Sequence, residues 1–224
     1  MPDATDPSGP TVAPEDGQRA LALLGLVTAG ALASFARLAD DAVSAPDVAG
    51  RLTLTRMAGE SLAHLDELER AIEDRAGDPA AAAGPFLALL GDLDARTTPR
   101  DWWERLMRTY VAGGMVIDLQ RAMSAGLDGP VRALARDALV ENGHADYVVR
   151  TLAPVVEAEP QLAARLALWG RRVAGEALSL AQNVVRACPL PAGDADGAEA
   201  AVTALVSAMT GGHARRMGRL GLTA

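Results

Sequence analysis

Almost every long segment of this 224-residue chain repeats its hydrophobic residues with the period of an α-helix, about 3.6 residues. The sequence contains no alternating run of β-branched residues bounded by turn residues, which would indicate a strand. The periodicity therefore predicts an all-α protein. The predicted helices cover residues 18–43, 47–75, 98–125, 130–152, 161–186 and 199–219, and an irregular stretch with a short helical piece precedes residue 98.

The order of these helices predicts how they pack. The first and second helices, and the third and fourth, are joined by short breaks, which is typical of two antiparallel hairpins in a four-helix bundle. Additional helices follow at the C-terminal end. We expect a disordered tail rich in acids and prolines at 1–17, one bundle domain at 18–187, a linker at 188–198, and a C-terminal helix and tail at 199–224.

The charge of the chain limits the partners it can have. A formal net charge of −8 argues against a protein that coats nucleic acid, because such proteins present a basic face. A local basic patch is still compatible with this charge. The segment GGHARRMGRLG collects His213, Arg215, Arg216 and Arg219, which could contact the phosphates of an RNA or form the solvated face of a terminal helix.

Two features predict where the protein resides. The single cysteine, Cys188, cannot form an internal disulfide and fits a reducing compartment. Residues 20–36 carry no charge, but this stretch of 17 residues is shorter than the roughly 20 that a membrane helix needs. We therefore expect a buried core helix, no membrane partner, and a cytoplasmic protein.

The stretch GESLAHLDEL, residues 59–68, places His64 four residues after Glu60. Acid–histidine pairs at helical spacing suggest a metal inside a bundle. At about 100° per residue, however, His64 shares the apolar stripe with Ser61, whereas Glu60 lies at the rim of that stripe. His64 is a candidate metal ligand whose inward-facing neighbour is a serine.

A second pair, Glu141 and His144, occurs in VENGHADYVV. On a helix through residues 130–152 both side chains fall on the apolar face. At positions i and i+3 they can bind one ion, as the Glu-x-x-His half-sites of carboxylate-bridged di-iron bundles do. Glu141 and His144 are therefore the second and third candidate metal ligands.

Glu176 is the one acid on the apolar stripe of residues 161–186. Because an unpaired buried carboxylate is costly, we expect Glu176 either to bind metal or to pair with an arginine such as Arg171 or Arg172. The inward stripes of the first and third helices offer no carboxylate. Those stripes read Ala20, Leu24, Val27, Ala31, Ser34 and Leu38, and Trp103, Leu106, Tyr110, Gly113, Ile117 and Gln120.

Five segments carry a family resemblance: LGLVTAGALASFARLADDA, RMAGESLAHLDEL, DWWERLMRTYVAGGMVIDL, GHADYVV and RLALWGRRVAGEALSLAQ. Together they resemble actinobacterial ferritin-like proteins classed as MiaE-like, over roughly residues 18–187. The class is named after a non-haem di-iron enzyme that hydroxylates isopentenyl-modified adenosine in tRNA. The resemblance implies a ferritin-like four-helix bundle with additional C-terminal helices. By a longer step it implies iron as cofactor, tRNA as partner and oxygen-dependent hydroxylation.

The ligand set that the resemblance implies is incomplete in this chain. The family's glutamate in the first helix falls on Ala31, its glutamate three residues before the first histidine falls on Ser61, and an acid of its third helix falls on Gly113. The residues that match are His64, His144 and Glu176, and Glu141 completes a Glu-x-x-His pair.

Charge separates three possible states of the site, because two ferrous ions bring four positive charges that buried anionic oxygens must offset. The chain could hold a full di-iron centre, a single ion bound by His64, Glu141 and His144, or no metal. We favour a depleted site with weak or no metal binding and a structural or interaction role. The alternative is a non-haem di-iron or mono-metal oxygenase that hydroxylates a modified adenosine in tRNA. A homodimer is the candidate assembly.

Overall fold

The computed structural model describes residues 14–125, 127, 129–140, 142–188 and 195–224. In these residues all regular elements are helices and no strand occurs, which confirms the all-α prediction. The helices are α1 (Pro14–Ser44), α2 (Val48–Glu60), α3 (Leu65–Glu73), α4 (Pro79–Arg96), α5 (Trp102–Ser124), α6 (Pro130–Ala138), α7 (His144–Ala158), α8 (Pro160–Ala187) and α9 (Ala195–Arg219).

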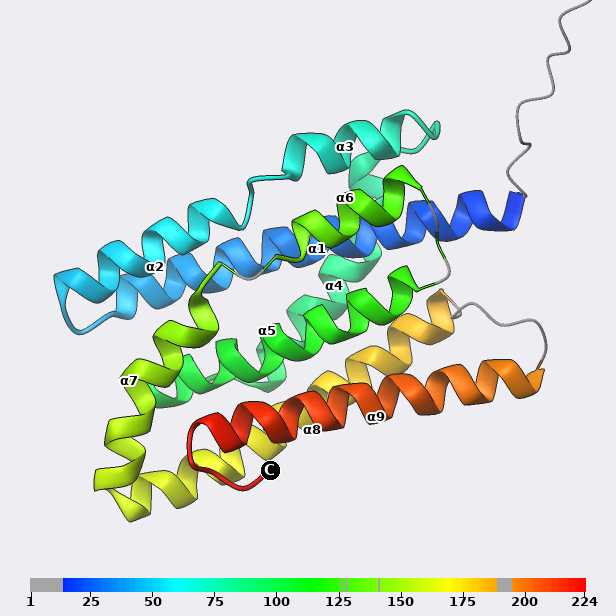
Figure 1. The fold of residues 1–224 in the computed structure, drawn as a ribbon. Coiled ribbons are helices and arrows are strands. Elements are labelled where there is room, and N and C mark those ends of the chain that lie inside the picture. Colours follow the sequence, from blue (N-terminus) through cyan, green and yellow to red (C-terminus); the bar gives the residue numbers. More distant parts are fainter. Residues whose placement is uncertain (1–13, 126, 128, 141, 189–194) are drawn as a thin grey trace, which may run out of the picture.

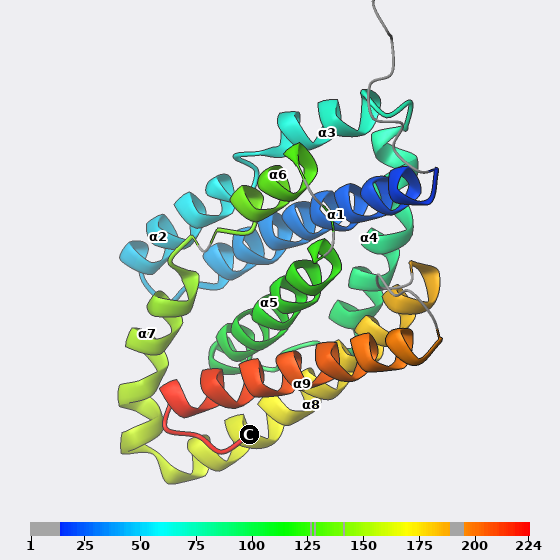
Figure 2. The ribbon, with the colours of Figure 1, turned by 45° about the vertical axis from the view of Figure 1, so that its right-hand side comes forward.

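Four helices form the central bundle. Helix α1 packs against α4 and α5, and α8 packs against the same two helices, which closes a four-helix arrangement. Helices α2, α3 and α6 lie along α1, whereas α9 lies along α5 and α8 (Figure 1). Helix α7 runs along one end of the bundle, from the side of α2 to the side of α8, in both views (Figure 2). The predicted four-helix bundle with additional C-terminal helices is therefore present.

The predicted pairing of the helices is wrong in two respects, because α4 and α8 occupy the places in the bundle that we assigned to the helices over residues 47–75 and 130–152. The stretch predicted to be irregular forms a full helix, which Asp78 caps by accepting a hydrogen bond from the Ala80 amide (3.1 Å). Helix α1 approaches α4 so closely that a Cβ at Gly25 would lie 2.2 Å from the carbonyl oxygen of Ala82. Glycine at this position permits the contact.

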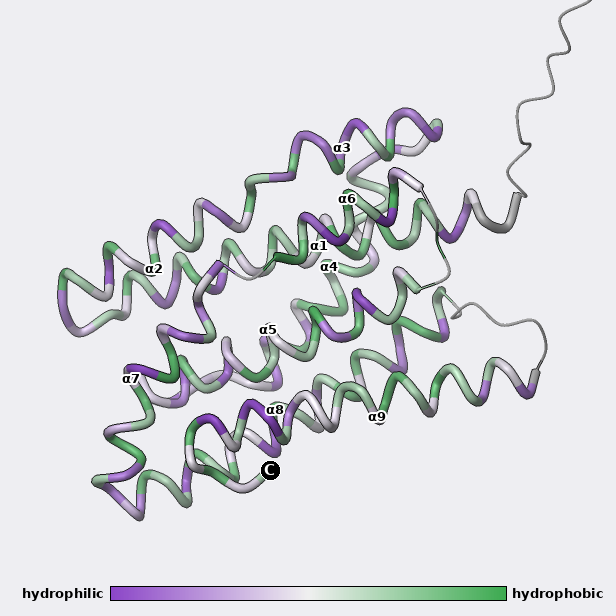
Figure 3. The backbone as a smooth tube through the Cα atoms, viewed as in Figure 1, coloured by the Kyte–Doolittle hydropathy of each residue, from purple (hydrophilic) through white to green (hydrophobic). Residues whose placement is uncertain are grey.

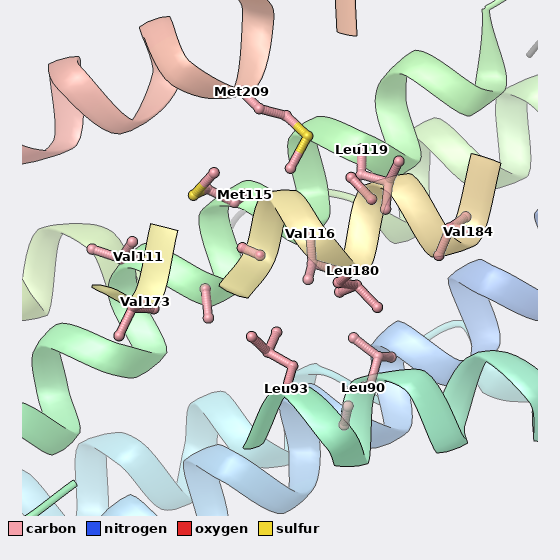
Figure 4. Close-up of a cluster of buried hydrophobic side chains, with 14 of the residues drawn as sticks. Leu90, Leu93, Val111, Met115, Val116, Leu119, Val173, Leu180, Val184 and Met209 are labelled. Atoms are coloured by element: carbon pink, nitrogen blue, oxygen red, sulfur yellow. The ribbon is translucent and has the colours of Figure 1, made fainter. Parts of the chain in front are cut away.

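Hydrophobic side chains from several helices meet in the core. Leu90 and Leu93 of α4 point toward Leu180 of α8 and Val116 of α5, and all four are buried (Figure 4). Along most helices hydrophobic and hydrophilic residues alternate, as expected for helices with one buried face (Figure 3). Aliphatic residues and methionine therefore supply most of this packing.

The predicted helix over residues 47–75 is interrupted. Helix α2 ends at Glu60 and α3 begins at Leu65, with a hydrogen-bonded turn between them. In that turn the Ser61 hydroxyl donates to the carbonyl oxygen of Met57 (3.0 Å), and the Leu65 amide donates to the carbonyl oxygen of Leu62 (3.1 Å). The apolar residues on both sides of the turn stay buried, Leu54 and Met57 before it and Leu68 and Ile72 after it.

The predicted helix over residues 130–152 is also interrupted. Helix α6 ends at Ala138 and α7 begins at His144. Gly143 has a φ of 79°, in the left-handed region that favours glycine, and the Asn142 side-chain oxygen accepts a hydrogen bond from the His144 amide (3.2 Å). Helix α7 then continues through Pro154, where we predicted a connector, to Ala158.

Several predicted boundaries shift at the helix ends. Helix α1 begins at Pro14, within the predicted tail, and α9 begins at Ala195, within the predicted linker. Helix α5 begins at Trp102, not at the predicted Thr98, because Asp101 accepts a hydrogen bond from the Glu104 amide (2.9 Å) and caps the helix. The rest of the tail, residues 1–13, and residues 189–194 of the linker lie outside the described residues.

Within the described residues, one helical segment, Gly17–Ser44 of α1, is long and apolar enough to cross a membrane by length and composition alone. In this fold 56% of its most apolar stretch is buried by other parts of the chain, and α2, α4 and α5 pack against it. This burial is typical of a core helix, as the sequence predicts.

Candidate functional site

A pocket of about 180 Å³ lies between α1 and α5. The end of α2, the junction between α6 and α7, and the C-terminal part of α9 complete its wall. Ser34 of α1 and Ser61 after α2 face each other with their hydroxyl oxygens 3.1 Å apart. Asn142 donates a hydrogen bond to the carbonyl oxygen of Met57 (3.2 Å), so the α6–α7 junction is held against the end of α2.

The pocket lies where the resemblance implies metal ligands. Ala31, Ser61 and Gly113, at the three positions where the resemblance implies an acid, all line it. His144 lines the same pocket. The side chains that replace the acids are small, so space is left between helices that would otherwise hold carboxylates.

Of the four predicted ligands, the structure places His144 in this pocket. His144 is half-buried as a residue, but its Nε2 atom is fully buried and has no hydrogen-bond partner among the described residues. Burial lowers the pKa of His144 from 6.5 to about 4, so the imidazole is neutral at pH 7. A neutral imidazole can donate or accept a hydrogen bond through Nε2.

His64 lies outside the pocket lining, in the turn between α2 and α3. Its Nδ1 atom is 2.9 Å from the Glu67 carboxylate, and its side chain is 37% exposed. The prediction that His64 shares a continuous inward stripe is wrong, since the helix is interrupted just before it. Its role as a metal ligand stays a prediction.

Glu176 lies on the α8 face that meets α4, and it does not line the pocket of His144. Its Oε2 atom is 3.6 Å from Nη1 of Arg96. Pairing with an arginine was one of the two predicted alternatives, but the partner comes from α4 and is neither Arg171 nor Arg172. The sequence did not identify Arg96 because its segment was predicted to be irregular.

Glu141 lies outside the described residues. Since α7 begins at His144, the continuous helix that the i, i+3 argument required does not extend before the histidine. Among the residues that the structure describes, no group of three or more histidine, cysteine, aspartate or glutamate side chains is placed to hold a metal.

The described donor set does not fit a di-iron centre. The pocket lining includes one imidazole, His144, and one carboxylate, Glu60, which is exposed at the rim as predicted. A di-iron bundle uses carboxylates from two helices and two Glu-x-x-His pairs. With neutral residues at three of the acid positions, the described lining provides too little negative charge to offset two ferrous ions.

Three arginines that the sequence reasoning missed as pocket residues line the pocket, Arg37 from α1 and Arg216 and Arg219 from α9. Arg37 of α1 is 5% exposed, and its Nε donates to Asp94 (2.8 Å). Arg216 of α9 donates through Nη2 to Asp118 (2.6 Å) and to the carbonyl oxygen of Gly114 (2.7 Å). Arg37 could have been identified from its position in the sequence, directly before Leu38 of the predicted inward stripe.

The segment around Arg216 is only in part the solvated helix face that was one of its two predicted alternatives. His213 is 7% exposed, and burial lowers its pKa, with the positive charges of Arg216 and Arg171 adding to the effect. Arg219 donates to Asp146 of α7 (2.6 Å), but it is exposed, as Arg215 is. His213 and Arg216 are directed into the fold, and a tRNA partner stays a prediction.

A buried carboxylate adjoins the pocket. Thr109, which lines the pocket, donates through its hydroxyl to Asp41 (2.7 Å). Burial raises the pKa of Asp41 from 3.8 to about 6, although this hydrogen bond and the charges of Arg108 and Arg105 act in the opposite direction. The wall of the pocket therefore depends on an ionisable contact between α1 and α5.

The fold and pocket define a ferritin-like helical bundle. Residues 17–189 match the family described as "Ferritin-like domain, actinomycetes". The chain belongs to this family. Comparison with curated protein sequences gives no match. Membership in the narrower MiaE-like class stays a prediction.

Proposed function

We propose that this ferritin-like protein has replaced a di-iron centre with a pocket that binds a small organic molecule. In this proposal the protein has an interaction role and binds metal weakly or not at all. The observation that carries it is the position of Ala31, Ser61 and Gly113, which line one pocket of about 180 Å³. These are the positions at which the resemblance implies acids.

Volume supports this proposal. A buried apolar cavity of about 150 Å³ binds benzene in another protein, so a pocket of the present size suits a molecule with one ring. Apolar side chains of Val27, Leu38, Val116 and Ile117 line part of the pocket. They would gain contacts from such a molecule, because atoms facing empty space lack partners for dispersion attraction.

The donor chemistry also supports it. A single-ion site of His64, Glu141 and His144 would need His64 in the pocket, and His64 lies outside its lining. The carboxylates of Asp94 and Asp118 are also unsuited as metal ligands here. They form ion pairs with Arg37 and Arg216 and do not line the pocket.

Elemental analysis of protein purified from iron-supplemented cells tests the metal part of the proposal. We expect well under one metal ion per chain. Two irons per chain with an oxo-bridged absorption band would instead support the oxygenase alternative. That alternative also requires a hydroxylated tRNA base to disappear in a strain lacking the gene.

The binding part of the proposal is tested by filling the pocket. Ala31→Leu places three additional carbon atoms in it, whereas Ala164→Leu adds the same atoms to an exposed position on α8. Single-ring compounds should raise the melting temperature of the wild type and of Ala164→Leu, but not that of Ala31→Leu. Equal stabilisation of all three proteins would contradict a pocket ligand.

A further inference from the structure

We propose that the pocket between α1 and α5 takes an organic anion, a carboxylate attached to an apolar body with a single ring. This inference rests on the proposed function, that the pocket binds a small organic molecule, and it specifies the chemical class. Among the described residues of the lining, four are charged, and three of these are cations: Arg37, Arg216 and Arg219, against Glu60. Each arginine pairs with an aspartate that does not itself line the pocket, Asp94, Asp118 or Asp146, so the cations face the pocket and their counter-charges lie behind its wall.

Arg37 provides the first unused donor. Asp94 accepts the hydrogen bond of Arg37 Nε at 2.8 Å and so fixes one edge of the guanidinium. The Nη2 atom of the same group is fully buried and has no partner among the described residues. A buried donor without an acceptor costs free energy, and because Arg37 lines the pocket, a small shift of its side chain would let a ligand oxygen supply that acceptor.

Arg216 of α9 provides the second unused hydrogen-bond donor. Asp118 and the carbonyl oxygen of Gly114 both accept from its Nη2 atom, at 2.6 and 2.7 Å. The Nη1 atom is buried and finds no acceptor within the described part of the chain. The Tyr110 hydroxyl donates to the carbonyl oxygen of Arg216 (3.3 Å), which ties the α9 backbone to α5. The guanidinium is therefore held in place before any ligand binds.

These two donors favour a carboxylate over a neutral acceptor. Hydrogen bonds between a guanidinium and a carboxylate are charge-assisted and stronger than those to a neutral oxygen. The neutral imidazole of His144, whose Nε2 atom is also buried without a described partner, adds a third polar group to the same lining. The aliphatic residues Val27, Leu38, Val116 and Ile117 would surround the apolar body.

Water is the competing occupant, because ordered water can satisfy the same donors. Three probes of similar size separate the possibilities: benzoate, its neutral analogue benzyl alcohol, and the cation benzylamine. Calorimetric titration of the full-length protein should give an affinity for benzoate at least about tenfold above that for benzyl alcohol, a difference of about 1.4 kcal/mol. Benzylamine should not bind.

Variants test whether Arg216 causes the preference for benzoate over benzyl alcohol. Arg216→Gln should reduce the preference for benzoate over benzyl alcohol from about tenfold to under about threefold. Arg136→Gln, which removes an exposed arginine that does not line the pocket, should leave the preference unchanged. If Arg216→Gln does not fold, the same preference is measured in Arg216→Lys, which keeps the positive charge but lacks the Nη1 donor. Benzoate binding that survives in Ala31→Leu would place the anion outside the pocket and overturn the inference.

The ligand series also separates this inference from the function on which it rests. If benzoate and benzyl alcohol bind equally and Ala31→Leu abolishes both, the anion preference is overturned and the organic-ligand pocket stands. If none of the three probes binds to the wild type, the pocket holds water alone, and both proposals fail.

Discussion

Arg216 of α9 and Asp118 of α5 form an ion pair 2.6 Å long, and each side chain is only 16% exposed. The pair fastens the last helix to the centre of the bundle at the edge of the pocket. In this pair α9 approaches α5 closely, and the Arg216 guanidinium lies directly over Gly114 of α5. The neighbouring residue, Gly113, faces open space, and this difference between two adjacent glycines gives the first prediction.

Gly114→Ala should destabilise the protein. The added Cβ would lie 2.0 Å from the Arg216 Nε atom, so the guanidinium must move and the ion pair must lengthen. Overpacking of this kind costs about 1–3 kcal/mol, which urea unfolding can measure.

Gly113→Ala is the matched control. Its Cβ would meet no described atom within 4 Å, and alanine is the better helix former, so stability should rise by about 0.5–1 kcal/mol. A similar effect of both substitutions would show that the contact of Arg216 with Gly114 is not tight.

Removing the buried histidine should change the pH dependence of stability. His144 has a pKa of about 4 in the folded protein and an ordinary value of 6.5. Between these values the unfolded state binds more protons, so the stability present above pH 6.5 is lost as the pH falls toward 4, by about 3 kcal/mol in all. His144→Gln should lack this loss, as measured by urea unfolding at pH 4, 5, 6 and 7. A parallel pH profile for variant and wild type would contradict the burial of the imidazole.

Asp41→Asn should have the opposite effect. The pKa of Asp41 is about 6 in the folded protein against 3.8 ordinarily, so the folded state binds more protons between these values. Its contribution is therefore fully present at low pH and decreases as the pH rises through this range, by about 3 kcal/mol. In the wild type the two groups oppose each other between pH 4 and 6. Asp41→Asn should accordingly lose stability more steeply on acidification than the wild type does.

His64→Ala should have little effect on stability. The pair of His64 with Glu67 is exposed, and exposed ion pairs contribute at most about 1 kcal/mol. Metal content and the binding of single-ring compounds should also stay unchanged, because His64 does not line the pocket. A measurable loss of bound metal in this variant would restore His64 as a ligand and count against the proposed function.

The sequence predicts the pocket best where helices are uninterrupted. Counting about 100° per residue placed Ala31 and Ser34 on the inward face of the first helix, and Gly113 and Ile117 on that of the third. All four line the pocket, because α1 and α5 run without interruption past it. Angular counting is valid only while the helical phase is preserved.

At the two interruptions the same counting holds only in part, since Ser61 and His144 line the pocket as counted and His64 does not. The Ser61 hydroxyl bond to Met57 and the left-handed Gly143 alter the backbone locally, while the hydrophobic period of the sequence continues across both sites. Contacts between segments far apart in the sequence could not be predicted either. The pair of Arg37 with Asp94 could not be inferred, because Asp94 was predicted to lie on a short helical piece whose place in the bundle was not recognised.

The C-terminal helix has a consequence for the diversity of related proteins. The family match ends at residue 189, whereas Arg216 and Arg219 of the pocket wall belong to α9. Two proteins with the same ferritin-like domain but different final helices would therefore share the cavity and differ in the charge at its edge. Ligand selectivity in such proteins would be able to diverge by exchange of one appended helix, with the bundle core left untouched.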